Sequence, residues 1–131
     1  MRPTSTTYRL ARSGGEYNAL YAMMMREGFP RQPLRWPVVV AERDNRVVGF
    51  LGTWDTPDAI IAGPAVIAGG RNVLMMMRLA EAYENVLRLA RISSYLITVE
   101  RGNSAQVERV QRVGYKRIGE DADHVWFKRE L

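Results

Sequence analysis

The chain has 131 residues, a net charge of +5, one histidine and no cysteine. A chain of this length suits one domain that buries about two-thirds of its unfolded surface, so we expect a single domain over residues 1–131. Without cysteine there is no disulfide or thiolate chemistry, and a single imidazole argues against a metal site. No apolar run approaches the roughly 20 residues of a membrane span. We therefore expect a soluble, cytoplasmic protein without membrane contact.

The positive charge comes almost entirely from arginine, because Lys116 and Lys128 are the only lysines. An arginine side chain holds phosphate through a planar fork of donors, which suits either a phosphorylated small molecule or nucleic acid. A general bias toward arginine codons would give the same composition. The arginines are scattered and form no dense basic run, so the sequence disfavours nucleic acid as a partner.

Apolar residues that alternate predict strands, and apolar residues spaced by three or four predict helices. Ser13 and Glu16 have the spacing of a capping box at the start of a helix. Asp44-Asn45 suits the tight turn of a hairpin, because both residues tolerate left-handed backbone. The predicted elements are a strand at Thr6–Ala11, a helix from Ser13 to Gly28, strands at Val38–Glu42 and Val47–Trp54, a strand that begins at Ala59–Ala62, a helix from Asn72 to about Ile92, a strand at Ser94–Glu100, a short helix from Asn103 to Gly114, and a hairpin of Tyr115–Ile118 with His124–Arg129.

Some segments keep two interpretations open. Phe29–Pro37 contains three prolines and is either a packed connector or one wall of a substrate pocket. Gly49 and Gly52 lie inside a predicted strand and indicate a bulge or the close approach of another backbone. The methionine triplets Met23–Met25 and Met75–Met77 are interpreted as core residues that fill gaps.

The stretch from Gly63 to Asn103 organises the rest of the chain. Gly63-Pro64 must end or bulge the preceding strand, because proline has no N–H group for the ladder. The strand, helix and strand that follow one another imply a parallel crossover. Glu84 is placed on the solvated stripe of the helix. The amides of Gly69–Val73 precede a helix N-terminus and can cradle an anion, although a plain connector would have the same residues.

The order of elements resembles the GCN5-related N-acetyltransferase (GNAT) family. Asn103, the apolar residues after it and Gly114-Tyr115 resemble the family signature of asparagine followed by Gly-Phe/Tyr, and VVVAERDNRVVGFLG resembles its central hairpin. The resemblance covers nearly the whole chain and implies an α+β fold, with a mixed, mostly antiparallel twisted sheet of about six to seven strands and helices on both faces. The compact chain also resembles acetyltransferase-like domains encoded by tailed phages, some of them internal virion proteins.

The resemblance implies acetyl-CoA as the co-substrate. The family's loop pattern, Val-x-Pro-x-x-Gln/Arg-x-x-Gly-x-Gly/Ala, places Pro64 at the proline and Ile67 at the Gln/Arg position. Ile67 has no side-chain donor, and Asn72 is larger than the final Gly/Ala, so both depart from the pattern. The pantetheine arm would enter between the strands at Ala59–Ala62 and Tyr95–Glu100. The implied cofactor-binding residues are Ile67, Ala68, Gly69, Gly70, Arg71, Asn72, Val73 and Asn103, with Arg78 as a further phosphate contact.

The resemblance also implies transfer of the acetyl group to an amine, of a small molecule or a peptide, by direct attack. Many family members have a tyrosine where this chain has Val110, which can do no proton chemistry. Glu42 and Glu100 are carboxylates near strand ends, and Glu100 is the better candidate for the general base. An exposed carboxylate without a role is the alternative. A catalytically degenerate binding or virion-assembly protein is the alternative function, and the sequence is compatible with a homodimer.

Overall fold

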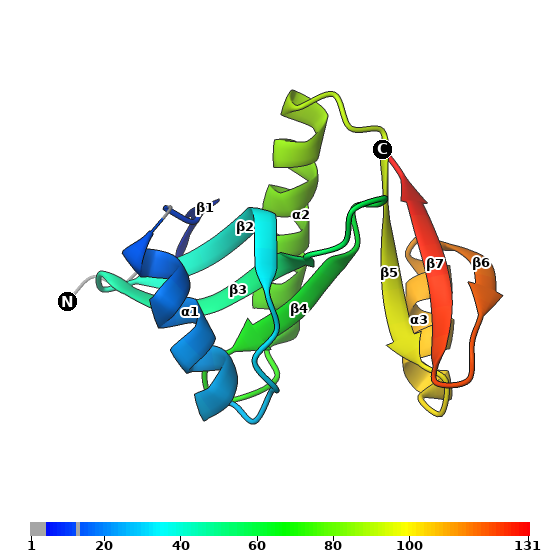
Figure 1. Cartoon of the computed structure of the whole chain (residues 1–131), viewed down its shortest axis with the longest axis horizontal. Helices are drawn as coiled ribbons and strands as arrows, with labels where there is room; N and C mark the ends of the chain where they lie inside the picture. Colours follow the sequence, from blue (N-terminus) through cyan, green and yellow to red (C-terminus); the bar gives the residue numbers. More distant parts are fainter. Residues whose placement is uncertain (1–4, 13) are drawn as a thin grey trace.

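A computed structural model describes residues 5–12 and 14–131. The strands form two sheets, one in the order β1-β2-β3-β4 and one in the order β5-β7-β6, and every pair within them is antiparallel (Figure 1). Among the described residues, no helix combines the length and the apolar composition that crossing a bilayer requires. The elements are β1 (Thr7–Leu10), α1 (Gly15–Arg26), β2 (Leu34–Arg43), β3 (Arg46–Trp54), β4 (Ala62–Ile67), α2 (Val73–Leu89), β5 (Ser94–Glu100), α3 (Ser104–Arg112), β6 (Lys116–Glu120) and β7 (His124–Glu130).

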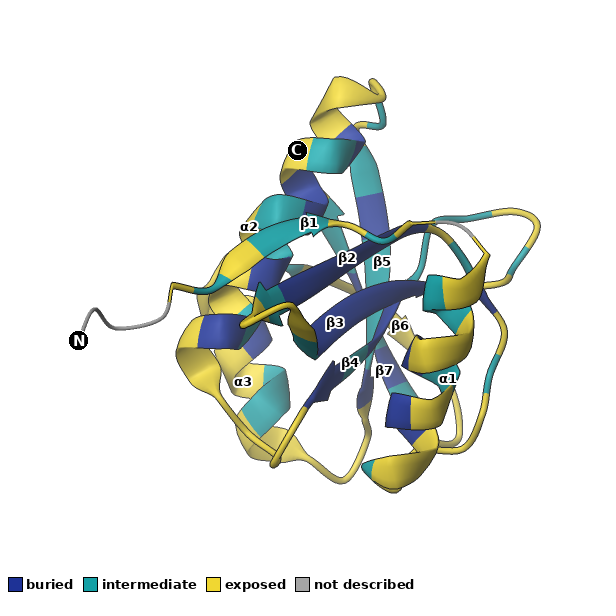
Figure 2. Ribbon diagram, turned by 90° about the vertical axis from the view of Figure 1, so that its left-hand side faces the viewer, coloured by how far each residue is buried: buried dark blue, intermediate teal, exposed yellow. Residues whose placement is uncertain are grey.

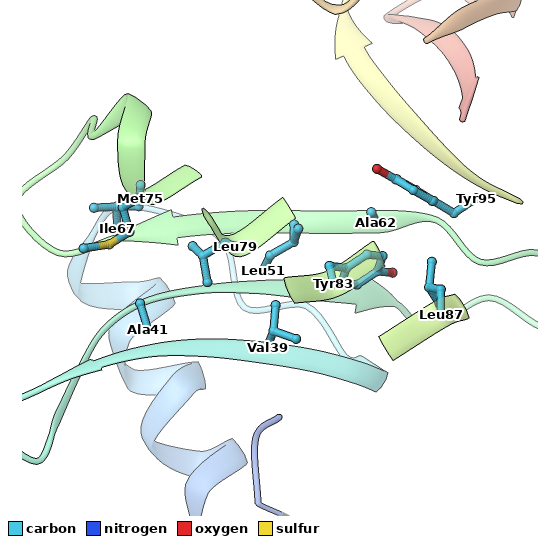
Figure 3. Packing of buried hydrophobic residues seen from close by; sticks show 10 residues of the cluster. All are labelled: Val39, Ala41, Leu51, Ala62, Ile67, Met75, Leu79, Tyr83, Leu87 and Tyr95. Atoms are coloured by element: carbon cyan, nitrogen blue, oxygen red, sulfur yellow. The ribbon is translucent and has the colours of Figure 1, made fainter. Parts of the chain in front are cut away.

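The first sheet is covered on both faces, by α1 on one side and α2 on the other (Figures 1 and 2). Successive side chains of a strand point to opposite faces, so alternate residues of β2 pack against different helices. Val38 and Val40 contact the α1 cluster, whereas Val39 and Ala41 contact the α2 cluster (Figure 3). The predicted α+β class, with helices on both faces, is confirmed.

The second sheet is covered by α3 on one face. Val99 of β5 and Phe127 of β7 pack there against Val110 of α3. The neighbouring residues along β5 and β7 point to the opposite face because side chains alternate along a strand. The two sheets are joined by one parallel bridge, between Ile61 and Leu96. Beyond this bridge β4 and β5 diverge, which leaves the gap between these two strands that the resemblance to the family implied.

Several predicted turns and close contacts are confirmed. Asp44 and Asn45 have φ angles of 53° and 61° in the β2–β3 turn. A Cβ atom on Gly49 would lie 2.9 Å from the Met75 sulfur, and one on Gly52 would lie 2.8 Å from a Leu34 methyl carbon. Backbone oxygens of Val66 and Gly63 follow at 3.3 Å and 3.4 Å, so another backbone approaches both glycines closely, as predicted. The helix caps at Asn72 and Asn103 are also present.

Two segment boundaries differ from the predictions. Strand β2 begins at Leu34, inside the segment predicted to be irregular, and a register shift near Pro37 accommodates the proline in the pairing with β3. Strand β4 includes Gly63 and Pro64, where a register shift against β3 shows that the strand bulges and continues. The loop before α2 is consequently short, covering residues 68–72.

Three side-chain predictions also need correction. Met25 and Met77 are 64% and 56% exposed, so each methionine triplet contributes only part of its residues to the core. Ser13 lies outside the described residues, and the cap of α1 is Gly14, which makes no side-chain hydrogen bond. The Glu16 carboxylate accepts hydrogen bonds from the Arg12 amide and the Arg9 guanidinium instead.

Candidate functional site

A cleft of about 660 Å³ opens where β4 and β5 diverge. On the side that faces the cleft, β4 pairs with no described strand beyond the bridge at Ile61, so its main-chain groups form an open strand edge there. The cleft is lined by Ala62, Gly63, Pro64 and Ala65 of β4, by Tyr95, Ile97, Thr98, Val99 and Glu100 of β5, by Met76 and Ala80 of α2, by Gln106 and Val110 of α3, and by Phe29, Leu51, Trp54, Asn103, Tyr115 and His124.

The structure brings Asn103 and Glu100 together at one end of this cleft. The Asn103 side-chain oxygen accepts a hydrogen bond of 3.2 Å from the Gln106 amide, so the residue caps α3 and lines the cleft at the same time. Glu100 is exposed at the end of β5 and lies opposite His124 in the β5–β7 register. Val110 is buried against Phe127 and can take no part in proton transfer.

The loop at the head of α2 is built as predicted in its backbone, but several of its hydrogen-bond donors already have partners. Gly69 and Gly70 have φ angles of 79° and 101°. The Gly69 amide donates to the Glu27 carboxylate at 2.9 Å, and the Gly70 amide donates to the Ile67 carbonyl at 3.0 Å. The Asn72 side chain accepts from the Met75 amide at 3.0 Å.

Among the described residues no acceptor is found for the amides of Arg71 and Asn72 in the loop, or for those of Val73 and Leu74 at the start of the helix. Arg71 lines a small cavity of about 290 Å³ beside Glu27, whereas Arg78 is exposed and paired with Glu81 at 3.2 Å. The Ile67 side chain lies in the core, so this residue offers a ligand only its main chain.

A buried network of hydroxyl groups crosses from α2 to the second sheet. The Tyr95 hydroxyl donates to the Glu84 carboxylate at 2.7 Å and lies 2.6 Å from the Tyr115 hydroxyl, while Arg129 donates to the same carboxylate at 3.1 Å. Burial raises the pKa of both tyrosines, so they remain protonated at neutral pH. Glu84 is 9% exposed, and its assignment to a solvated stripe was wrong.

Sequence reasoning missed a second cavity of about 390 Å³, which shares Trp54, Thr98 and His124 with the cleft. Trp126 and His124 line this cavity, and Asp121 holds both of them in place. Its carboxylate accepts hydrogen bonds from the Trp126 indole at 2.9 Å and from the amides of Asp123 and His124. These hydrogen bonds lower the pKa of Asp121 to about 2, and the bond from the indole has the largest effect. The single histidine among acidic residues was the one signal in the sequence that could have pointed to this place.

No protein-family model and no curated protein matches the sequence. Solved structures do match. The ribosomal-protein-S18-alanine N-acetyltransferase of Escherichia coli is 13% identical with a TM-score of 0.75, over 97% of this chain and 94% of that one. The ribosomal-protein-alanine N-acetyltransferase of Brucella melitensis is 17% identical with a TM-score of 0.72, over 95% and 99%. A GNAT family acetyltransferase from Elizabethkingia anophelis with acetyl-CoA bound is 13% identical with a TM-score of 0.65, over 96% and 98%.

These likenesses cover nearly the whole of each chain, and the shared architecture is that of the N-acetyltransferases. More particularly, the chain has the GCN5-related N-acetyltransferase fold, as its sequence predicted.

Proposed function

We propose that the protein is an acetyl-CoA-dependent N-acetyltransferase that transfers the acetyl group to an amine by direct attack. The observation that carries the proposal is the cleft between β4 and β5, which runs from the unpaired edge of β4 to Asn103 and Glu100. A neighbour of the same fold has acetyl-CoA bound, which supports a thioester as the co-substrate.

The residues of the cleft fit such a co-substrate. Main-chain groups of β4 would pair with the amides of the pantetheine arm, and the Asn103 side chain would contact the same arm. The free amides of Val73 and Leu74, with Arg71 beside them, would hold the pyrophosphate at the positive end of the α2 dipole. The Glu27 carboxylate opposes this binding, because its negative charge lies at the Gly69 amide.

The transfer needs one bond made and one broken. The amine first loses the proton that makes it an ammonium ion, and its lone pair then forms the C–N bond with the thioester carbonyl. The C–S bond breaks, and the sulfur leaves with both electrons and takes a proton from water. The second amine proton passes to Glu100, directly or through one water molecule. The hydroxide left by the water takes the proton from Glu100, which returns to its carboxylate form, so the balanced outcome is an amide, a free thiol and the one proton that the ammonium ion released.

Calorimetry with CoA and acetyl-CoA at millimolar concentration tests the proposal. We expect a saturable heat and a rise in melting temperature with both ligands, and their complete absence would overturn the proposal. Gly70→Trp should abolish the heat by filling the loop at the head of α2. Gly14→Trp is the matched control, because Gly14 also has a positive φ angle and an equally open environment, at the start of α1.

A second candidate is a catalytically silent relative that serves as a binding or virion-assembly module. Two observations favour it. Glu27 occupies the Gly69 amide, which an anion would otherwise use, and a buried valine stands at position 110, where many family members have a tyrosine. Thiol release from acetyl-CoA with a panel of amines distinguishes the two candidates. Turnover that is lost in Gly70→Trp excludes the silent module, whereas binding of CoA without any thiol release favours it.

A further inference from the structure

The cavity beside the cleft has a definite chemical character. Its walls come from separate parts of the chain: the segment before β2 (Gln32), the last residue of β3 and the loop after it (Trp54 and Asp55), and the open face of the second sheet (Thr98 and Trp126). Thr98 and Trp126 are cross-strand partners, and the cavity joins the cleft at Trp54, Thr98 and His124. A molecule in this cavity would therefore reach the place where the thioester is proposed to lie.

The two indole rings are held in position by the structure. A Cβ atom on Gly63 would lie 2.6 Å from the Trp54 indole nitrogen, so the indole packs directly on the backbone of β4. The Trp126 indole is held by its hydrogen bond of 2.9 Å to Asp121. Aromatic rings fixed by their surroundings bind apolar groups without a large entropic cost, and their faces attract cations.

The charge around the cavity is acidic although the chain as a whole is basic. The chain has 19 lysine and arginine residues, yet among the described residues neither the cavity nor the cleft is lined by any of them. Asp55 lines the cavity, Glu100 lines the cleft, and Asp121 contacts Trp126. Two cations lie nearby: Arg35 donates to the carbonyl of Thr56, a residue that lines the cavity, and Lys128 pairs with Glu130 at 3.3 Å.

We infer that this cavity is the acceptor site, and that it selects an ammonium group carried on an aromatic or otherwise bulky apolar body. This inference rests on the proposed function, because it names the amine that the acetyl group would reach. Trp54 and Trp126 bind the apolar body, and Asp55 attracts the positive charge. The nitrogen then lies toward His124 and Glu100, at the junction with the cleft. A free arylalkylamine and the amino terminus of a peptide with an aromatic first residue share this chemistry.

Fluorescence titration tests the inference directly and needs no turnover. In a Trp36→Phe background, with excitation at the red edge where indole absorbs and the six tyrosines do not, the emission comes only from the two cavity indoles. We expect 2-phenylethylamine to change this emission saturably, with at least about tenfold weaker binding of the neutral 2-phenylethanol and the anionic 3-phenylpropanoate. Asp55→Asn should weaken the amine about tenfold. Asp58→Asn is the matched control, because Asp58 lies in the same loop and does not line the cavity.

Two peptides distinguish the sources of the ammonium group. Binding of Phe-Gly-Gly amide that is lost on acetylation of its amino terminus indicates a peptide acceptor, whereas binding of 2-phenylethylamine alone indicates a free amine. The inference is overturned if 2-phenylethanol binds as well as the amine, or if Asp55→Asn has no effect. Calorimetry with acetyl-CoA separates this failure from failure of the proposed function. If the protein binds acetyl-CoA but binds 2-phenylethanol as well as 2-phenylethylamine, only the inference about the acceptor site is contradicted.

Discussion

The cleft between the sheets and the loop at the head of α2 adjoin each other, yet they are built in opposite ways. The cleft leaves the edge of β4 and the side chains of Asn103 and Glu100 accessible. The loop has its Gly69 amide bound to Glu27, and Asn72 already caps the helix. If the proposed function holds, the path for the co-substrate arm is open, whereas the chain's own groups occupy part of the end that would bind the pyrophosphate. We therefore expect binding energy to come mainly from the arm of the co-substrate.

The largest effect is expected in the cleft, from Glu100→Gln. The amide has the same shape but cannot accept a proton, so thiol release in the presence of an amine should fall by about 10²- to 10⁴-fold. Affinity for CoA, measured by calorimetry, should not change. Glu108→Gln, which removes a carboxylate exposed on α3, should leave both quantities as they are. An unchanged rate in Glu100→Gln would remove this residue from the reaction.

The next effect concerns the buried network that attaches the second sheet to α2. Tyr95→Phe removes the hydroxyl group that joins Glu84 to Tyr115, and we expect the free energy of unfolding to fall by about 1–3 kcal/mol. Urea unfolding measures this change. Tyr8→Phe, in which the hydroxyl has no hydrogen-bond partner among the described residues, is the control. Equal loss in the two variants would mean that the network adds no stability of its own.

The loop is tested by Glu27→Gln, which keeps an acceptor for the Gly69 amide and removes its negative charge. We expect CoA to bind about three- to tenfold more tightly, because a carboxylate no longer repels the pyrophosphate. The gain should shrink in 1 M salt, where charges are screened over about 3 Å. Glu130→Gln makes the same change of net charge on β7 and should have no effect. Weaker binding in Glu27→Gln would instead show that the ionised carboxylate orders the loop.

The smallest effect concerns the other end of α1, the helix that leads to Glu27. Hydrogen bonds from Arg9 are the main cause of the lowered pKa of Glu16, which also accepts the Arg12 amide. A lowered folded-state pKa contributes stability above the ordinary glutamate pKa of about 4.3, and this contribution is lost as the pH falls through the folded-state pKa.

The wild type should therefore melt at a higher temperature than Glu16→Gln at neutral pH. The corresponding difference in the free energy of unfolding is about 1 kcal/mol. The difference should disappear on acidification. Glu81→Gln breaks an exposed ion pair and should change the melting temperature little at any pH. A difference that persists at low pH would mean that packing, and not charge, fixes this end of α1.

The sequence alone predicted the parts of the fold that depend on local chemistry. The Asp44-Asn45 turn, the Asn72 and Asn103 caps and the close approach at Gly49 each follow from the conformation or size of one or two residues. The cleft was predicted for a different reason, since it came from the resemblance of the whole chain to a known fold. Its confirmation shows that the order of elements carried more information than any single motif.

Contacts between distant segments could not be predicted in this way. Glu27 and Gly69 are 42 residues apart, and nothing near Glu27 indicates that its carboxylate would meet a loop amide. Glu84 has the spacing of a solvated residue on α2. It is buried because Tyr95 and Arg129, from the second sheet, pack against it and donate to its carboxylate. The residues Gly63-Pro64 predicted that the strand either ends or bulges, and only its pairing with β3 shows that it bulges and continues.

The open edge of β4 also bears on how the protein avoids self-association. A strand with free main-chain groups is a template on which a strand from another molecule can add, and such pairing leads to aggregation. Here Pro64 interrupts the row of N–H donors in the middle of the strand, and β5 rises from the bridge at Ile61 to form the opposite wall of the cleft. The groups that would receive a substrate are thus accessible to a narrow chain of atoms and poorly accessible to a second sheet.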